Sequence, residues 1–458
     1  MRDALLFLII FGSVPFILKR PWIGVLVWCW LAYMNPQRLA WGAAYDFPFS
    51  MLIGVATIAA FVLHGGKRYP MTAVSGLMIV YALWTGLTTI FALMPQSAFE
   101  KWEMFMKVIV MNVITICLIN TRERLQALIW VITLSIGFFA LKGGLFTILT
   151  GGEHRVWGPP DSTIADNNHL ALALIMMLPF MYYFAQIALR RYMRVGMYGL
   201  MVLTLFAIVA TYSRGALVAI GTMCFFMWVK SRRRALLFFG GIACVITLSL
   251  FMPAQWYERM YSIGQYEEDA SAGGRFDSWN FGVRIANARP LGGGFNVFGY
   301  QHIFNIYYPD SVHGLARAAH SVYFEVLGEH GWIGFIIFMS LGTAAFFSCR
   351  WVNLRTRDRP DLSSLNDMSR MVQVSLVGFA AGGAFINVAH YDLYWHVIAI
   401  IVILRVLTEQ ALRQPASQTA PAGPIPVAAP MRPLGPAEVA VPQGARLGGQ
   451  SGFLIERS

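Results

Sequence analysis

Long runs of apolar residues recur along almost the whole chain, and they limit its fold more than any other feature. Hydrophobic residues make up 57% of the 458 residues and charged residues only 13%. Soluble domains contain fewer apolar and more charged residues than this. Runs of about twenty apolar residues are typical of helices that cross a bilayer, whereas the strands of a membrane barrel alternate in polarity over short segments. The sequence therefore predicts an all-α, polytopic integral membrane protein.

Thirteen apolar segments can be distinguished, at residues 4–18, 21–34, 49–64, 71–93, 104–119, 125–148, 168–189, 195–211, 215–229, 235–252, 320–348, 371–389 and 394–409. At a rise of ~1.5 Å per residue, the first two are too short to cross a hydrocarbon core of ~30 Å comfortably. They form either two crossings or one broken crossing, so we expect about 12 (12–13) transmembrane helices. Lys19 and Arg20 follow the first segment where a signal peptide has small residues, so we expect an uncleaved first helix.

Five short basic connections orient the chain: Lys67-Arg68, "TRER" at 121–124, "RRYMR" at 190–194, "KSRRR" at 230–234 and "RTRDR" at 355–359. By the positive-inside rule these connections are cytoplasmic, which makes the long connection between the tenth and eleventh apolar segments periplasmic. We expect four regions: N-terminal transmembrane helices at 1–252, a large periplasmic loop at 253–319, C-terminal transmembrane helices at 320–410, and a disordered cytoplasmic tail, rich in Pro and Ala, at 411–458.

A single arginine interrupts the apolar run from 195 to 229, in the stretch "IVATYSRGALVAIGT". Both ends of this run carry basic connections of the cytoplasmic side, so the chain must go out and return. The turn falls at "TYSRG", which puts Arg214 at the outer face, at the start of the returning helix. A lone arginine there could equally snorkel to the interface and only mark it.

Further cations lie on the same side as Arg214. The orientation puts Lys107 and Lys142 in the outer halves of apolar helices, Arg155 in an outer connection, and Arg275 and Arg284 in the long loop. Ionisable groups inside apolar helices are costly and point to function. Guanidinium groups bind phosphate through bidentate, charge-assisted hydrogen bonds. We therefore expect an anionic ligand at the outer leaflet.

Three histidines follow in the outer stretch "SVHGLARAAHSVYFEVLGEHGWIG": His313, His320 and His330. His320 stands where the eleventh apolar segment begins. Histidine is the side chain best suited to act as a general base near neutral pH, although a histidine at a helix start is often structural. Glu325 and Glu329 come one and two turns later and could either orient this site or pair with its cations.

Motifs of several other protein classes do not occur in the sequence. It contains no G-x-x-x-x-G-K-[ST] phosphate loop, no H-E-x-x-H, no G-x-S-x-G and no D-x-D. We expect neither coupling to ATP, nor a metal site or other cofactor, nor a nucleic-acid partner. The acidic cluster "YEEDAS" at 266–271 is most simply a solvated loop tip.

Four stretches, "TYSRGA", "GGRFDSW", "NARPLGGGFNVFG" and "AHSVYFEVLGEHGWIG", resemble successive motifs of the O-antigen ligase and polymerase family of bacterial glycan-transferring membrane enzymes. The last is the most specific, since the pattern H-[NS]-x-Y-x3-L-x-E-x-G-x2-G is met at His320, Ser321, Tyr323, Leu327, Glu329, Gly331 and Gly334. "ADNNHLALAL" around Asn168 is similar to another family feature. "RPWIGVLVWCWLAYMNPQRLAWG" near the N-terminus resembles the branch of exosortase-A-associated O-glycosylation ligases. The resemblance covers about residues 1–410.

The resemblance implies a glycosyltransferase that moves a glycan from undecaprenyl pyrophosphate to an acceptor hydroxyl, usually on lipid A-core, at the periplasmic face of the bacterial inner membrane and without a metal. Family usage assigns pyrophosphate binding to Arg214 and Arg275 and the role of base to His320, which gives inversion in a single displacement. Further candidate substrate-binding residues are His313, Arg284, Arg155, Lys142, Lys107, Asn168, Glu329 and Tyr323. The expected partners are the lipid-linked donor, the glycan acceptor and membrane lipids.

Other functions stay open at this point. A polymerase of the same family would use a second lipid-linked glycan as acceptor, and a protein O-oligosaccharyltransferase would use a protein. A transporter of lipid-linked glycans is the rival from another class. Transporters place charges near the midplane and show internal repeats, whereas the cations here gather at one face.

Overall fold

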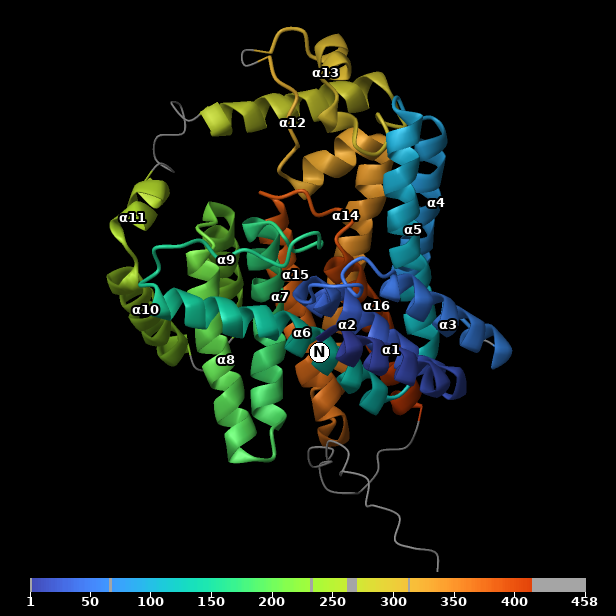
Figure 1. The fold of residues 1–458 in the computed structure, drawn as a ribbon, viewed down its shortest axis with the longest axis vertical. Coiled ribbons are helices and arrows are strands. Elements are labelled where there is room, and N and C mark those ends of the chain that lie inside the picture. Colours follow the sequence, from blue (N-terminus) through green and yellow to red (C-terminus); the bar gives the residue numbers. More distant parts are fainter. Residues whose placement is uncertain (1, 66–67, 231–233, 262–269, 312–313, 414–458) are drawn as a thin grey trace, which may run out of the picture. The chain divides into compact units, whose positions relative to one another are not determined.

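The computed structural model describes residues 2–65, 68–230, 234–261, 270–311 and 314–413. Within these ranges every regular element is a helix (Figure 1). This confirms the predicted all-α class. The expected tail at 411–458 lies outside the described residues from residue 414 onward, as does most of the acidic cluster at 266–271.

Sixteen α-helices are described, and each of the thirteen predicted apolar segments falls on a helix of its own. The helices are α1 (Arg2–Lys19), α2 (Pro21–Met34), α3 (Phe49–Leu63), α4 (Ala73–Ile90), α5 (Pro95–Leu118), α6 (Arg122–Leu149), α7 (Asn167–Ile187), α8 (Arg191–Ala210), α9 (Arg214–Lys230), α10 (Arg234–Phe251), α11 (Ala254–Tyr261), α12 (Ala270–Ala288), α13 (Gln301–Tyr307), α14 (Val322–Thr356), α15 (Ser363–Gly383) and α16 (Asp392–Leu412). Three short 3-10 turns are η1 (Pro36–Leu39), η2 (Val297–Gly299) and η3 (Pro360–Leu362).

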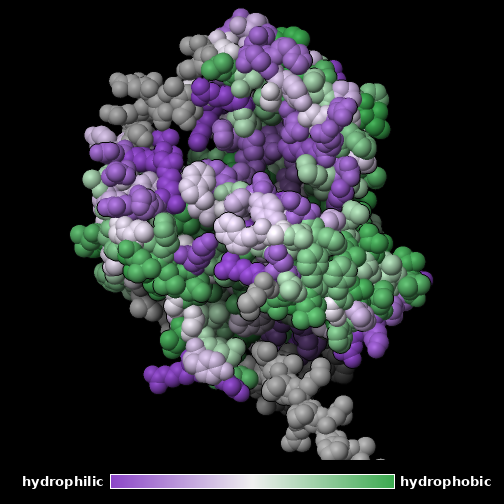
Figure 2. Space-filling view, in the orientation of Figure 1, coloured by the Kyte–Doolittle hydropathy of each residue, from purple (hydrophilic) through white to green (hydrophobic). Residues whose placement is uncertain are grey.

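Whether a helix can cross a membrane depends on its length and its content of apolar residues. Among the described residues six helices, α4, α6, α7, α8, α14 and α16, are long and apolar enough to cross a bilayer, or up to seven if the bent pair α10 and α11 counts as one. Apolar helices α2, α3 and α9 are shorter. A multi-pass membrane protein is therefore supported, while the count of 12–13 crossings stays a prediction. Figure 2 shows hydrophobic side chains over α1, α3, α8 and α10, and hydrophilic ones around α12 and α13.

The described part of the connection expected at 253–319 contains three α-helices and one 3-10 turn. Chain direction changes by 116° between Phe238–Phe251 and Ala254–Tyr261, and α11, α12 and α13 follow. Figure 1 shows α12 lying across the end of the bundle, where it packs on α14. The space-filling view of this face is hollowed beneath α12 and has hydrophilic side chains around the hollow (Figure 2).

Helix α14 is broken at Gly331, whereas the apolar pattern alone suggested one continuous segment. Gly331 has φ 67° and ψ −176°, and a Cβ there would collide with the carbonyl oxygen of Pro290. The N–H groups of Gly293 and Gly294 bond to the carbonyl oxygens of Gly328 and Glu329 at 2.8 Å each. The "PLGGGF" stretch therefore provides hydrogen-bond partners for the carbonyl groups that the break leaves free. Because the two backbones approach closely, glycine is needed both at 331 in α14 and in this stretch.

The predicted orientation can be tested by thiol labelling. In a chain with Cys224 and Cys244 replaced by Ser, the three remaining native cysteines are buried. We expect a membrane-impermeant maleimide to label His302→Cys, on α13, in intact spheroplasts, and to label Asp358→Cys only after lysis; both sites are exposed. Labelling of Asp358→Cys in intact spheroplasts would reverse the orientation.

Candidate functional site

The first residues of three helices meet around the turn at 384–391, which joins α15 to α16. The ring Nε2 of His169, at the start of α7, lies 3.1 Å from the carbonyl oxygen of Asn387. A Cβ on Gly215, at the start of α9, would lie 2.8 Å from the Cβ of Phe385. A Cβ on Gly383 would lie 3.0 Å from Val322, at the start of α14. This turn therefore brings the neighbourhoods of Asn168, Arg214 and His320 together, although they are far apart in the sequence.

His320 is held against α12 by the backbone that precedes it. The indole N–H of Trp279 donates to the carbonyl oxygen of Ala319 at 2.8 Å, and the Ser278 hydroxyl donates to that of Arg317 at 3.1 Å. Both donors lie about one turn after Arg275 on α12. The predicted base and one predicted pyrophosphate ligand are thus positioned by the same helix.

His320 adopts φ 46°, a left-handed conformation that is uncommon for a residue other than glycine. It immediately precedes Ser321, the N-cap of α14. Such strain is often found where a side chain must be aimed in a particular direction. His320 is exposed, so its imidazole is accessible from outside the helix bundle.

The surroundings of His320 favour its neutral form. Partial desolvation lowers the pKa of His320 first, and the positive charge of Arg275 lowers it further. Asp166 opposes this effect, whereas His169 and Arg317 add to it. A neutral imidazole keeps a lone pair available, which a general base requires.

Asp166 caps α7 and remains a carboxylate. Its Oδ1 accepts from the backbone N–H of Asn168 at 2.8 Å and from the ring Nδ1 of His169 at 3.3 Å. The hydrogen bond from His169 is the main reason that the pKa of Asp166 lies well below its usual range. Both ring partners of His169, Asp166 and the Asn387 carbonyl, are acceptors. His169 therefore joins the start of α7 to the turn at 384–391.

The turn predicted at "TYSRG" separates α8, which ends at Ala210, from α9, which begins at Arg214. Tyr212 has φ 57°, and its hydroxyl donates to the carbonyl oxygen of Gly152 at 2.8 Å. The side-chain amide of Asn167 donates to the carbonyl oxygen of Thr211 at 2.7 Å. The start of α7 therefore fixes the turn that carries Arg214, and the N-terminal end of α9 adds partial positive charge there.

Arg155 joins this turn through an aromatic ring. Its guanidinium carbon lies 5.6 Å from the ring centre of Tyr212, and its side chain is exposed. Arg259 donates from Nε to the carbonyl oxygen of Tyr212 at 3.1 Å. The structure thus places Arg155 beside Tyr212, two residues before Arg214.

Other predicted substrate ligands have structural partners or lie on helix surfaces. Arg284 pairs with Asp310 at 3.3 Å, and its guanidinium carbon lies 4.4 Å from the ring centre of Tyr308. The Tyr323 hydroxyl donates to the carbonyl oxygen of Ala380 at 2.7 Å and so ties α14 to α15.

The two lysines predicted inside apolar helices are both exposed. Lys107 pairs at 2.7 Å with Glu103, one turn away on α5, and both side chains are more than half exposed. Lys142 is exposed on α6. His313 lies outside the described residues. Direct roles for these residues in substrate binding stay predictions.

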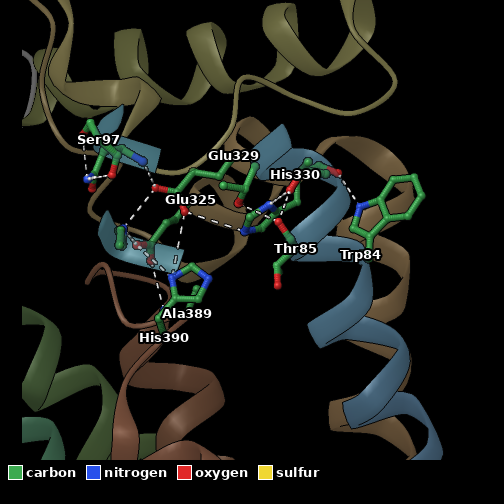
Figure 3. A network of polar contacts seen from close by, with 12 residues as sticks. Trp84, Thr85, Ser97, Glu325, Glu329, His330, Ala389 and His390 are labelled. Atoms are coloured by element: carbon green, nitrogen blue, oxygen red, sulfur yellow. Dashed lines mark hydrogen bonds and ion pairs between the residues drawn. The ribbon is translucent and has the colours of Figure 1, made fainter. Parts of the chain in front are cut away.

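A buried charged network lies beneath this region, and sequence reasoning identified only part of it. Lys101 Nζ lies 3.1 Å from Glu329 Oε1 and 3.4 Å from Glu325 Oε1 (Figure 3). The carboxylates are only 2% and 4% exposed, so Glu329 does not present itself at the surface as a substrate ligand. Glu325 Oε2 accepts from the backbone N–H of Ala389 at 3.0 Å. Lys101 therefore joins α5 to α14, and Glu325 joins α14 to the turn at 384–391.

The signal that could have identified Lys101 was weak. It precedes the apolar segment at 104–119, where basic residues commonly end a membrane helix. Its partners follow 224 and 228 residues later, a separation that no local pattern can bridge.

Replacing Lys101 should destabilise the fold strongly. Lys101→Met leaves two buried carboxylates without their cation, and breaking a buried pair from one side costs ~3–5 kcal/mol. We expect a marked fall in the melting temperature of the purified protein. Lys107→Met is the matched control on the same helix, because its exposed pair with Glu103 is worth ~1 kcal/mol or less. Equal melting temperatures for the two variants would show that the network does not hold the helices together.

Comparison with known families divides the chain in two. Residues 199–339 match the family described as O-Antigen ligase, in agreement with the resemblance of the motifs. Residues 1–189 match a family of unknown function (DUF5935). No match was found among curated proteins.

Proposed function

We propose that this chain, whose residues 199–339 belong to the O-antigen ligase family, is a glycan ligase that works on a lipid-linked donor. The donor is a polysaccharide on undecaprenyl pyrophosphate, and the acceptor hydroxyl lies on lipid A-core or a related glycan. We place the reaction at the periplasmic face of the bacterial inner membrane. The observation that carries this proposal is the position of His320, whose pKa is lowered by partial desolvation and by the positive charges of Arg275, His169 and Arg317.

The displacement needs charge stabilisation on one side of the anomeric carbon and a base on the other. The bond from the anomeric carbon to the pyrophosphate oxygen breaks, and the bond to the acceptor oxygen forms. Undecaprenyl pyrophosphate leaves with growing negative charge, which Arg214 and Arg275 would bind more tightly in the transition state than in the ground state. His320 would take the acceptor proton, and the anomeric configuration would invert.

The positive charge around His320 is complementary to the negative charge of a pyrophosphate donor. Arg275, Arg317 and His169 all act on His320 as positive groups, while Asp166 is the one negative group among them. A pyrophosphate would bring negative charge into this positive region. We also propose that 253–319 faces the periplasm and that the tail at 411–458 is cytoplasmic, as the charge pattern predicts.

The test is reconstitution with defined substrates. The full chain in lipid nanodiscs is mixed with an undecaprenyl-pyrophosphate glycan and either lipid A-core, a second copy of the donor, or an acceptor protein, and products are identified by mass spectrometry. Glycan appearing on lipid A-core supports the ligase. Chain extension on the donor would show that the protein is a polymerase instead of a ligase. Glycan attached to the acceptor protein would show that it is a protein transferase. If donor crosses the bilayer and no acceptor is modified, the protein is a transporter.

A further inference from the structure

Three buried side chains point unpartnered atoms at one another next to the network of Lys101. Glu329 Oε2 lies 3.9 Å from His330 Nε2 and 3.9 Å from His390 Nδ1 (Figure 3). None of these atoms has a hydrogen-bond partner among the residues that the structure describes. The side chains of Glu329, His330 and His390 are 2%, 0% and 8% exposed, respectively. Buried polar atoms are rarely left unsatisfied, so this arrangement calls for a ligand between them.

Hydrogen bonds around the cluster indicate which proton His330 carries. Thr88 Oγ1 lies 2.8 Å from His330 Nδ1, and the Thr88 hydroxyl donates to the carbonyl oxygen of Thr85 at 3.0 Å. Because a hydroxyl has one proton, both bonds exist together only if His330 Nδ1–H donates to Thr88. His330 Nε2 is then a bare lone pair aimed into the cluster. Metal-binding histidines are held in this way, with the other ring N–H bonded to a protein acceptor.

Glu329 also has one oxygen engaged and one left over. Its Oε1 accepts from Lys101 and, at 2.8 Å, from the backbone N–H of Asn296. Its Oε2 faces the two imidazoles. A carboxylate oxygen and a bare imidazole nitrogen repel each other, and 3.9 Å is too long for a shared hydrogen bond. A positive or proton-donating group between them would remove this repulsion.

The separations suit a metal ion. Zinc binds imidazole nitrogen and carboxylate oxygen at about 2.0–2.1 Å, which puts tetrahedral ligands about 3.3 Å apart. The three ligand atoms lie within 4.8 Å of one another, so small side-chain shifts would close the site. Two carboxylates and one lysine also leave a net negative charge when the histidines are neutral, which a divalent cation would offset.

We propose that Glu329, His330 and His390 bind a divalent transition-metal ion of the zinc type. Two imidazoles and one carboxylate, without a thiolate, are the ligands such ions accept. The ion would be enclosed by side chains that are almost fully buried, and the proposed transfer step does not use it. It clamps α14, beside its break at Gly331, to the turn at 384–391, on which the starts of α7 and α9 rest. The motifs in the sequence gave no reason to expect a metal.

The test measures metal directly. The untagged full chain is purified in detergent, stripped with chelator, incubated with Zn²⁺ or Co²⁺ and desalted, and its metal content and Co²⁺ d–d absorption are recorded. We expect about one ion per chain and a rise in melting temperature, since a ligand that binds only the folded state stabilises it. His390→Gln should abolish both signals. The control His302→Gln alters an exposed histidine on α13 and should leave both unchanged.

A second variant keeps the test informative if His390→Gln does not fold. Thr88→Val preserves shape and removes the acceptor of His330 Nδ1–H together with the hydrogen bond to the Thr85 carbonyl, so it should weaken metal affinity ~10–100-fold. An internal water is the competing occupant, because it could donate to Glu329 and His330 together. Sub-stoichiometric metal in the wild type, with no Co²⁺ spectrum and no change in melting temperature, would overturn the proposal in favour of the water.

Discussion

Arg275→Ala and Arg214→Ala should each reduce glycan transfer to background while the protein still folds. Stabilisation of the departing pyrophosphate is the main electrostatic task in the proposed reaction, and removing one preorganised donor to a developing charge costs ~10²–10³-fold in rate. Arg275 also acts electrostatically on His320, so its loss affects both sides of the anomeric carbon. The measurement is single-turnover transfer from a lipid-pyrophosphate glycan, with the melting temperature recorded for each variant.

Arg284→Ala is the matched control for Arg275→Ala, because both arginines lie on α12. Arg284 is paired with Asp310 and packed on Tyr308, and we expect it to retain most of the transfer rate. Lysine at 214 or 275 should rescue poorly, since an ammonium cannot reproduce the bidentate contact of a guanidinium with phosphate. Near-normal rates in both lysine variants would show that these arginines are general countercharges. If Arg284→Ala and Arg275→Ala lowered the transfer rate equally, Arg275 would have no special role in binding pyrophosphate.

The apolar pattern predicted the helices well because burial in lipid and burial in protein demand the same residues. Each apolar segment lies on its own helix, and the turn before Arg214 falls where the basic flanks required it. Helix α12 could not be found in this way. Its sequence "ASAGGRFDSWNFGVRIANA" has no long apolar run and two adjacent glycines, and it is helical through packing on α14.

Candidate site residues were predicted with uneven success because the sequence gives the type of a side chain and not its partner. Arg275 and Arg284 looked alike as loop arginines, yet α12 places one beside His320 and the other on Asp310. The role of each arginine depends on a partner that is distant in the sequence. Lys101 and His390 stayed unrecognised because their carboxylate partners are supplied by α14, which is distant in sequence from Lys101.

His320→Ala should lower transfer by ~10²–10⁴-fold, the usual contribution of a general base, while donor binding remains near normal. Donor binding should persist because Arg214 and Arg275 are still present. His302→Ala, at an exposed histidine on α13, is the control and should transfer at the wild-type rate. A His320→Ala protein that transfers normally would end the assignment, and one that no longer binds donor would make His320 a phosphate ligand.

The pH dependence of transfer provides an independent check on the same residue. The neutral imidazole is the active form, and partial desolvation and Arg275 lower the pKa of His320 below its ordinary value of about 6.5. A lowered pKa means that the neutral form persists to lower pH, so kcat/KM should stay high on falling through pH 6.5 and decline only below it. Asp166 raises this pKa, and Asp166→Asn can still cap α7. This variant should therefore move the acidic limb to still lower pH. A shift to higher pH, or a limb that persists unchanged in His320→Ala, would show that another group titrates and that His320 is not the base.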